Sequence, residues 1–337
     1  MLHPHLLPLV AGMVACSSSM LAAVRLARSY AKSNDPIVVV GPTGTGKSRL
    51  ARQIHLWSGR AGRLAEVSAR ELCGALAYDQ LFGHERGAFT DAVGRRHGVF
   101  AEAGAGTVLL DDAQLLDRGA QMLLLRALDT GVYRPLGTDR EVPIASRLVV
   151  GTQRDLDSMA AEDAVLPDLR YRLGFFEIRL DPLAMRREDV GPLAREFLTA
   201  CSGDLDSETA LAVSPDVLAL LEAAPWRGNV RELEYAIRFA SWKAREDGAH
   251  QVAVEHLPPH LRVRLQFDPL SDRETKRRLV SWALWRTNGH VGRAAELIQA
   301  HRNTVSALRA EMEENGIDLP NRGPSLVQVG VEHEAWG

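Results

Sequence analysis

A glycine-rich octapeptide, GPTGTGKS at residues 41–48, is the segment whose residue types and spacing point most directly to chemistry. It fits the pattern G-x-x-x-x-G-K-[ST], in which glycines let backbone N–H groups converge on phosphate oxygens. The pattern predicts that Lys47 reaches the β- and γ-phosphates of a nucleotide and that Ser48 binds Mg²⁺. The predicted nucleotide-binding residues of this P-loop are Gly41, Pro42, Thr43, Gly44, Thr45, Gly46, Lys47 and Ser48.

Two adjacent carboxylates in GTVLLDDAQ (106–114) supply a second part of such a site. Asp111 and Asp112 follow an apolar run, and a P-loop needs a carboxylate that holds Mg²⁺ at the end of another core strand. Asp111 is therefore expected to bind the metal, and Asp112 to polarise the attacking water. Two acids that only cap a strand end are the alternative interpretation.

A sheet must position these side chains. The apolar runs PIVVV (36–40), SRLVVGTQ (146–153) and FFEIRL (175–180) read as strands, and 118–129 reads as a helix. Strands that alternate with helices predict a parallel, doubly wound α/β sheet, which binds ligands at the carboxyl ends of its strands. Gln153 falls at such an end and is expected to act as a sensor near the γ-phosphate.

Composition is that of a globular protein. The chain has 337 residues, enough for roughly two domains, with 46% hydrophobic residues and a net charge of −3. Cys16, Cys73 and Cys201 have no metal or redox spacing, which favours a reduced, cytoplasmic compartment. Residues 6–16 are apolar but too short to span a bilayer and lack flanking positive charge. We expect a short strand there before the first helix, with a signal peptide as the alternative.

The charge is unevenly distributed. Residues 273–310 contain eight Lys or Arg and two acids, a net charge of +6 on an otherwise acidic chain. Three helical segments are expected at 274–287, 291–300 and 303–316, the last two separated by a tight turn. This pattern favours a helix-turn-helix that binds DNA, and a three-helix bundle that serves dimerisation is the alternative.

Eight stretches carry a resemblance to a known family. They are GPTGTGKS, DQLFGHERGAFTDA (79–92), GTVLLDDAQLL, LLRALDTGVYRPLG (124–137), RLVVGTQRDL (147–156), LPDLRYRL (166–173), RREDVGPLAREFL (186–198) and PWRGNVRELE (225–234). In this order they resemble the AAA+ domain of bacterial enhancer-binding proteins, the activators of sigma-54 RNA polymerase. The C-terminal helices look like the Fis-type DNA-binding domain of the same proteins.

The resemblance implies ATP and Mg²⁺ as ligands and a ring, in this family a hexamer, with ATP between subunits. Arg172 would reach the γ-phosphate in a neighbouring subunit, a contact that can contribute ~10³–10⁵ in rate. Arg231 in a helical lid would contact ATP of its own subunit. A projecting loop would contact the sigma factor through Gly87, Ala88, Phe89, Thr90, Asp91 and Ala92. A tight turn with the Phe89 ring folded inward is the alternative.

The resemblance also gives domain boundaries and a DNA-contacting face. The expected segments are an N-terminal segment 1–19, an ATPase core 20–183, a lid 184–262, a linker 263–271, a helix-turn-helix domain 272–320 and a disordered tail 321–337. The residues expected to face DNA are Arg302, Asn303, Thr304, Ser306 and Arg309. Because about twenty residues precede the first helix, we expect the family's usual regulatory domain to be missing.

Five positions depart from the family pattern. Asp112 replaces Glu, Gln153 replaces Asn, and Ser68 replaces an Asn that restrains the catalytic acid; Leu166 replaces the first of two arginine fingers, and Asp91 replaces a loop glycine. Nucleotide binding is still expected, whereas hydrolysis is expected to be weakened.

Three functions therefore remain open: an ATP-dependent activator of sigma-54 RNA polymerase, a DNA-binding regulator whose ATPase is degenerate, and an AAA+ remodeller that acts on another target or forms a mixed ring with a paralogue.

Overall fold

The computed structural model describes residues 9–10, 13–74, 76–90, 92–202, 211–259, 290–297 and 300–314, with Leu261, Val280, Ala283, Leu284 and Thr287. The chain forms two compact units, Met1–Pro258 and Pro259–Gly337. Asp91, the expected linker 263–271 and the expected tail 321–337 lie outside the described residues, as does most of the expected helix 274–287.

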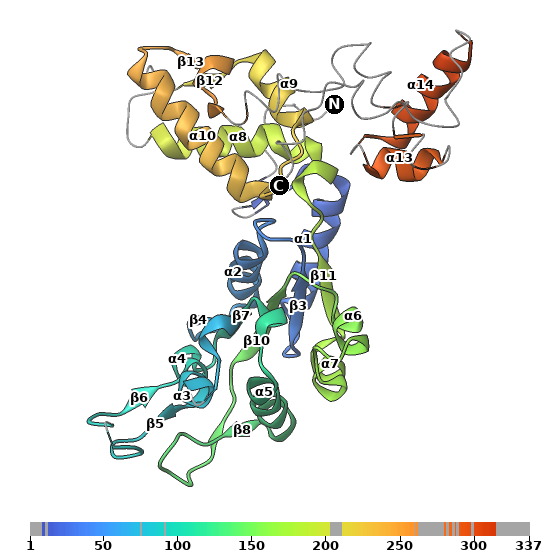
Figure 1. Ribbon diagram of the computed structural model, residues 1–337. Coiled ribbons are helices and arrows are strands. Elements are labelled where there is room, and N and C mark those ends of the chain that lie inside the picture. Colours follow the sequence, from blue (N-terminus) through green and yellow to red (C-terminus); the bar gives the residue numbers. More distant parts are fainter. Residues whose placement is uncertain are drawn as a thin grey trace. The chain divides into compact units, whose positions relative to one another are not determined.

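A five-stranded parallel sheet runs through the first unit (Figure 1). The strands are β3 (Ile37–Val40), β4 (Leu64–Ser68), β7 (Thr107–Asp111), β10 (Arg147–Thr152) and β11 (Phe176–Arg179). Their spatial order is β11-β3-β10-β7-β4, so β3 and β7 both flank β10. The predicted parallel α/β sheet is confirmed, and the carboxyl ends of β3, β10 and β7 adjoin one another.

Helices cover both faces of this sheet, which explains why its strands are continuous apolar runs. Ile37 and Val39 pack with α1 and α2, whereas Val38 and Val40 point to the opposite face and pack with the other helices. The two helices of the first layer are α1 (Ser18–Tyr30) and α2 (Lys47–Ser58). The second layer contains α3 (Leu76–Phe82), α4 (Val99–Ala103), α5 (Arg118–Thr130), α6 (Leu156–Ala161) and α7 (Pro167–Leu173). The predicted helix 118–129 corresponds to α5.

Short antiparallel pairs and 3-10 turns join these layers. The pairs are β1 (Leu9–Val10) with β2 (Met13–Val14), β5 (Gly83–His84) with β6 (Arg96–His97), and β8 (Val132–Tyr133) with β9 (Val142–Pro143). The turns are η1 (Ala69–Glu71) and η2 (Ala113–Leu115). The β5–β6 hairpin projects beyond α3 and α4 (Figure 1), and a bridge between His84 and Leu136 joins it to the segment after β8.

A helical subdomain follows the sheet in the same unit. Its elements are η3 (Leu183–Met185), η4 (Arg187–Asp189), α8 (Val190–Ser202), β12 (Ala212–Val213), α9 (Pro215–Ala223), α10 (Asn229–Glu246), β13 (Gln251–Val252) and η6 (Val254–His256). α10 packs along α8, and Trp226 is buried with its indole N–H donating to Leu221 O at 2.7 Å. These contacts give the subdomain its own core.

The second unit contains α13 (Val291–Leu297) and α14 (Arg302–Glu314), close to two of the expected C-terminal helices. Its core consists of Val280, Ala283, Leu284, Ala294, Ala295, Val305, Leu308 and Met312. Within the described part of the chain, no helix has the length and apolar character needed to cross a membrane.

Candidate functional site

The P-loop lies between β3 and α2, and its lysine donates hydrogen bonds to carbonyl groups of the loop itself. Gly44 and Gly46 have φ of +77° and +106°, a region in which side chains are strained. Lys47 is buried, and its Nζ donates to Gly41 O at 2.8 Å and Pro42 O at 3.1 Å. Burial lowers the pKa of Lys47, and the nearby Asp111 carboxylate opposes that shift. The lysine therefore already lies over the loop whose N–H groups would hold phosphates.

Asp111 joins this loop to the end of β7. Its Oδ2 accepts a hydrogen bond from Ser48 Oγ at 2.9 Å, and its Oδ1 accepts one from the N–H of Asp112 at 2.9 Å. Gly151 on β10 makes room for it, since a Cβ there would lie 2.7 Å from Asp111 Oδ1. The predicted metal-binding pair thus meets across two elements, and its hydroxyl and carboxylate oxygens are the ligand type that Mg²⁺ prefers.

Asp112 is held by three side chains from different parts of the chain. Its backbone is left-handed, with φ of 56°. Gln114 Nε2 and Gln153 Nε2 donate to its Oδ1 at 3.1 and 3.0 Å, and Arg70 Nε lies 3.4 Å from its Oδ2. Burial alone would raise the pKa of Asp112, but the hydrogen bonds from Gln153, Gln114 and Arg70 outweigh it and hold the pKa below its usual range. The carboxylate is thus kept ionised and oriented.

One cavity of about 340 Å³ collects these groups with residues of the helical subdomain. The lining residues are Thr43, Gly44, Gly46, Lys47, Ser48, Arg49, Arg70, Asp111, Asp112, Gln153, Phe197, Val230, Arg231 and Glu234. The predicted P-loop lysine, both acids, the predicted sensor Gln153 and the predicted lid residue Arg231 therefore share one space.

The helical subdomain is fastened to the P-loop through the start of α10. Asn229 has φ of 54°; its Nδ2 donates to Thr43 O and its Oδ1 accepts from Leu183 N, both at 2.8 Å. The N–H of Val230 donates to Gly44 O at 2.9 Å. These bonds hold the first turn of α10, which carries Arg231, over the cavity.

A buried ion pair fastens the subdomain at a second place. Arg186 Nη2 donates to Thr45 O at 2.7 Å, and its Nη1 lies 3.6 Å from Asp189 Oδ2. The fully buried Asp189 carboxylate accepts from the N–H of Cys16 at 2.6 Å and from the N–H and Oγ of Ser17 at 2.7 and 2.8 Å. Since Ser17 caps α1, one carboxylate joins the start of α1 to the helical subdomain.

Residues 87–90 and 92, the described part of the segment predicted to be a recognition loop, lie between β5 and β6. Gly87 has φ of +83°, and its N–H donates to Ala92 O at 2.9 Å. Phe89 is 48% exposed, and its ring rests edge-on against His84 with centroids 4.8 Å apart. Asp79 holds that histidine, with His84 Nδ1 2.6 Å from Asp79 Oδ1. The Phe89 ring therefore lies at the surface rather than in the core.

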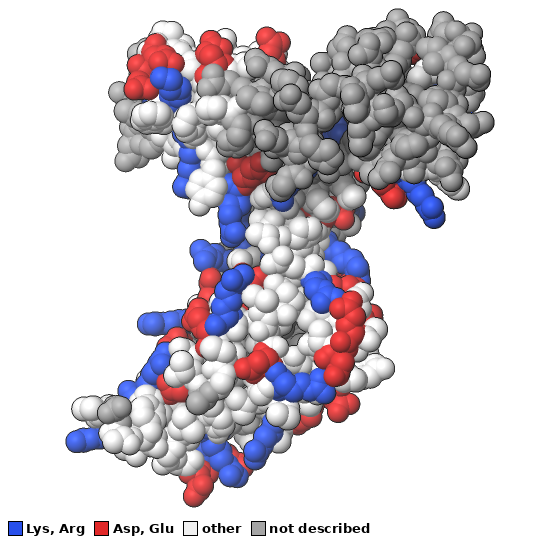
Figure 2. All heavy atoms as spheres, viewed as in Figure 1, with Lys and Arg blue, Asp and Glu red and all other residues white. Residues whose placement is uncertain are grey.

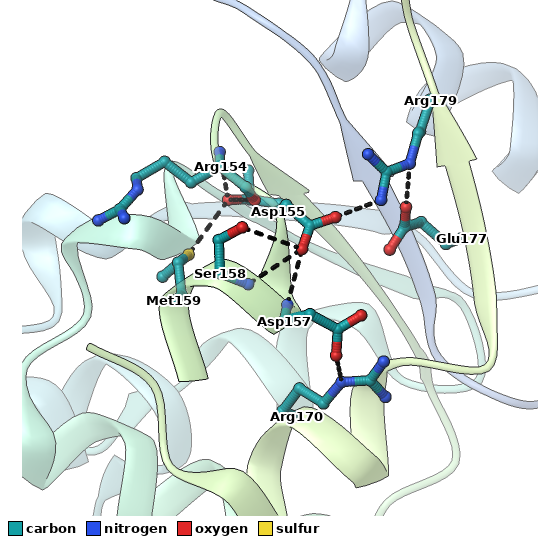
Figure 3. Close-up of polar contacts among 9 residues, drawn as sticks. Arg154, Asp155, Asp157, Ser158, Met159, Arg170, Glu177 and Arg179 are labelled. Carbon is teal, nitrogen blue, oxygen red and sulfur yellow. Dashed lines mark hydrogen bonds and ion pairs between the residues drawn. The ribbon is translucent and has the colours of Figure 1, made fainter. Parts of the chain in front are cut away.

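The predicted arginine finger, Arg172, lies on α7 and is not among the residues that line the cavity. Its Nη2 donates to Leu128 O at 2.8 Å and its Nε lies 3.3 Å from Asp129 Oδ1, with half of the side chain exposed. Arg170 is paired with Asp157 at 2.6 Å (Figure 3). Leu166, where the resemblance expects an arginine, packs against the core.

A network of ion pairs fixes α6 and α7 against the edge strand β11 (Figure 3). Asp155 accepts from the N–H groups of Asp157 and Ser158 at the start of α6 and also pairs with Arg179. Arg179 in turn lies 2.6 Å from Glu177. Over α6 and α7, basic and acidic side chains adjoin one another on the face seen in Figure 2. The segment after Gln153 is thus braced against the sheet.

In the second unit, α14 has one buried and one exposed face. Val305, Leu308 and Met312 are buried. The residues predicted to contact DNA are exposed at Arg302, Asn303, Thr304 and Ser306 and half-buried at Arg309.

The parallel sheet, the P-loop and the attached helical subdomain define the class of protein: a P-loop α/β fold of the AAA+ type with a helical lid. A family model described as "Sigma-54 interaction domain" matches residues 13–179, and one described as "AAA+ ATPase lid domain" matches residues 184–272. The chain belongs to the family of sigma-54-dependent transcriptional regulators.

Curated relatives and solved structures agree with this assignment. The regulatory protein AtoC of Escherichia coli (strain K12) is 32% identical over 316 residues, which cover 90% of this chain and 67% of AtoC. The hydrogenase regulator HoxA of Cupriavidus necator is 38% identical over 224 residues, 65% of this chain and 46% of HoxA. The structure of NtrX from Brucella abortus in complex with ATP matches with a TM-score of 0.66 and 28% identity, over 90% of this chain and 69% of NtrX.

Several residues that build the site had no role predicted from the sequence. Gln114 and Arg70 hold Asp112, and Asn229 and Arg186 fasten the lid. Ser68 stands where the resemblance expects an Asn that restrains the catalytic acid, and its Oγ accepts from the N–H of Arg70 at 3.3 Å. Gln114, Arg186 and Asn229 lie inside stretches that carry the family resemblance, whereas Arg70 lies in none of them.

Proposed function

We propose that this chain is an ATP-dependent transcriptional activator that remodels sigma-54 RNA polymerase. The observation that carries the proposal is the single cavity that gathers Lys47, Asp111, Asp112, Gln153 and Arg231. The match to the sigma-54 interaction domain and the likeness to an NtrX structure that contains ATP support it.

The P-loop would bind the phosphates of ATP. Lys47 would exchange the carbonyl oxygens of Gly41 and Pro42 for β- and γ-phosphate oxygens, which attract an ammonium group more strongly. Ser48 and Asp111 would hold Mg²⁺, which keeps several waters and phosphate oxygens and so needs few protein ligands. Bound Mg²⁺ would offset negative charge on the phosphates.

Hydrolysis would depend on Asp112 and on a second subunit. Asp112, oriented by Gln114 and Gln153, would accept a hydrogen bond from the attacking water and align it with the γ-phosphate. Arg172 is outside the cavity of its own chain, so it would act on ATP of a neighbouring subunit in a ring, which we propose to be a hexamer.

The energy of hydrolysis would reach the polymerase through the loop 87–92. The exposed Phe89 and its neighbour Thr90 would contact the sigma factor, and the nucleotide state would set the position of the hairpin that carries them. The exposed face of α14 would bind enhancer-like DNA through Arg302 and its neighbours. A regulator of this kind acts in the cytoplasm.

The test of the nucleotide site compares the whole chain with Lys47→Ala. Titration calorimetry with MgATP should show binding to the wild type and none to the variant. Arg52→Ala serves as a matched control, because Arg52 lies on the same helix in an exposed ion pair with Glu66. Retained binding by Lys47→Ala would contradict the assignment.

The test of the loop uses Thr90→Ala. This variant should hydrolyse ATP at the wild-type rate yet fail to support open-complex formation by sigma-54 polymerase. A variant that changes neither activity would show that the loop does not act on polymerase.

A second candidate function is a DNA-binding regulator in which nucleotide is a structural ligand. Two observations favour it: Leu166 packs against the core where the resemblance expects an arginine, and Arg172 is in an ion pair of its own chain. Both reduce the positive charge offered to a neighbour's γ-phosphate. Phosphate release at raised protein concentration separates the two: a rate equal to that of Lys47→Ala selects the second candidate. A mixed ring, in which a paralogue supplies the missing finger, would show turnover only after the paralogue is added.

A further inference from the structure

Arg70 lies beside the proposed catalytic carboxylate although no motif of the sequence points to it. It belongs to η1, directly after β4, and its Nε is 3.4 Å from Asp112 Oδ2. It also lines the same cavity as Lys47 and Arg231. Its guanidinium therefore faces both the carboxylate and the space that a nucleotide would occupy.

The two oxygens of Asp112 are held in different ways. Oδ1 accepts from the neutral amides of Gln114 and Gln153 at 3.1 and 3.0 Å. Oδ2 faces Arg70, whose side chain is 69% exposed and whose distance of 3.4 Å is near the limit of a hydrogen bond. Exposed ion pairs of this kind contribute little to stability. The guanidinium can thus change partner at small cost while the amides keep Oδ1 in place.

A γ-phosphate is the stronger partner for Arg70. It adds roughly two negative charges and three acceptor oxygens, against one charge on Asp112. Guanidinium groups bind phosphate oxygens with two parallel hydrogen bonds, which adds geometric selectivity. ADP lacks the phosphate that would lie nearest to Asp112, so it attracts the Arg70 guanidinium away from Asp112 less strongly.

The segment that begins with Arg70 leads to the loop 87–92. η1 packs against η2, which follows Asp112, and it continues into α3 and then the β5–β6 hairpin. The N–H of Gly74, between η1 and α3, donates to Asp117 at 2.9 Å. A change of partner by Arg70 therefore acts at the start of the segment that carries the loop.

We propose that Arg70 is a nucleotide-sensing residue that leaves Asp112 for the γ-phosphate of ATP. The triphosphate, unlike the diphosphate, then frees Oδ2 of Asp112 to meet the attacking water. This inference rests on the proposed ATP binding and assigns recognition of the nucleotide state to a residue of the same subunit.

The experiment measures dissociation constants of the whole chain for the Mg²⁺ complexes of β,γ-imido ATP and of ADP by calorimetry. Arg70→Ala should weaken the triphosphate analogue by roughly tenfold, as expected for one lost charge-assisted hydrogen bond, and change ADP by less than about twofold. Arg70→Lys should restore part of the preference because it keeps the charge. Arg52→Ala, an equally exposed arginine paired with Glu66, should change neither constant.

The same substitution in an Asp112→Asn chain distinguishes an exchange of partners by Arg70 from a simple attraction of Arg70 to the triphosphate. Asp112→Asn removes the competing charge, so Arg70→Ala should weaken the triphosphate analogue more in that background than in the wild type. An equal effect in both backgrounds, or an equal loss for both nucleotides, would overturn the inference. If the wild type binds neither nucleotide, the proposed function fails as well. If it binds both and Arg70→Ala leaves their ratio unchanged, only the role of Arg70 fails.

Discussion

Asp112 and Arg172 are both proposed to act on the same γ-phosphate, yet the structure treats them differently. Asp112 is three-quarters buried and is held by Gln114, Gln153 and Arg70 from separate elements. Arg172 is half exposed, and its guanidinium contacts Leu128 O and the Asp129 carboxylate at the end of α5. The residue proposed to act within its own chain is thus largely buried and oriented by three side chains, whereas the residue proposed to act on a neighbour lies half exposed and outside the cavity.

The largest effect on ATP turnover should come from removing Arg172, the residue proposed to act on the ATP of a neighbouring chain. Arg172→Ala should lower steady-state ATP turnover by about 10³-fold without weakening nucleotide binding, because its positive charge is needed only at the neighbour's γ-phosphate. Phosphate release and calorimetry measure the two quantities.

A mixing experiment sharpens this prediction. Chains with Lys47→Ala should regain turnover when mixed with Arg172→Ala chains, since some interfaces then combine an intact P-loop with an intact finger. Asp129→Ala is the control that removes only the partner of Arg172. Turnover that stays absent in the mixture would place Arg172 outside the active site.

The next largest effect concerns the contact between P-loop and lid. A Cβ on Gly44 would lie 2.3 Å from Gly228 O, and the residue has φ of +77°. Gly44→Ala should lower the free energy of unfolding by about 2–4 kcal/mol, which is roughly 4–16 °C in Tm for a unit of this size. Gly59→Ala shares the left-handed backbone, with φ of +66°, but meets no atom within 4 Å, so its Tm should fall less. Equal losses would mean that the lid does not rest on Gly44.

A smaller effect is expected where one of the two amides is removed from Asp112. Gln114→Ala should lower kcat by about tenfold with KM within twofold, because a carboxylate that has lost part of its restraint aligns water less often. Initial rates over a range of ATP concentrations give both constants. A change confined to KM would assign Gln114 to binding instead.

The smallest effect on stability should come from the loop tip. Phe89→Ala removes a half-exposed ring with one aromatic neighbour, so the free energy of unfolding should fall by less than about 1 kcal/mol. Phe82→Ala, which removes a buried ring stacked on Phe100 and Tyr133, should lower it by about 3–5 kcal/mol. Chemical denaturation compares the two. Similar losses would show that Phe89 is part of the core.

Much of the sheet could be predicted because its strands are buried on both faces. The runs around Ile37–Val40 and Arg147–Thr152 are apolar without alternation, and each ends in the polar residues of the site. Their spatial order could not be predicted in the same way, because strand pairing is set by contacts between distant segments.

The same limit applies within the site. Lys47, Ser48 and Asp111 follow from local spacing, and the structure brings them together. Arg70 reaches Asp112 from 42 residues away, and a sequence alone gives no measure of that approach. The residues assigned to sigma-factor and DNA contact stay predictions, because a contact residue is identified by the partner surface that it meets.

The buried Asp189 carboxylate links the beginning of α1 directly to the lid. It accepts hydrogen bonds from Cys16 and Ser17, and its partner Arg186 donates to the P-loop carbonyl of Thr45. We therefore expect a change in lid orientation on nucleotide binding to be passed on to a reporter protein joined ahead of Met13. A fluorescent protein joined at this position would thus serve as a reporter of nucleotide binding.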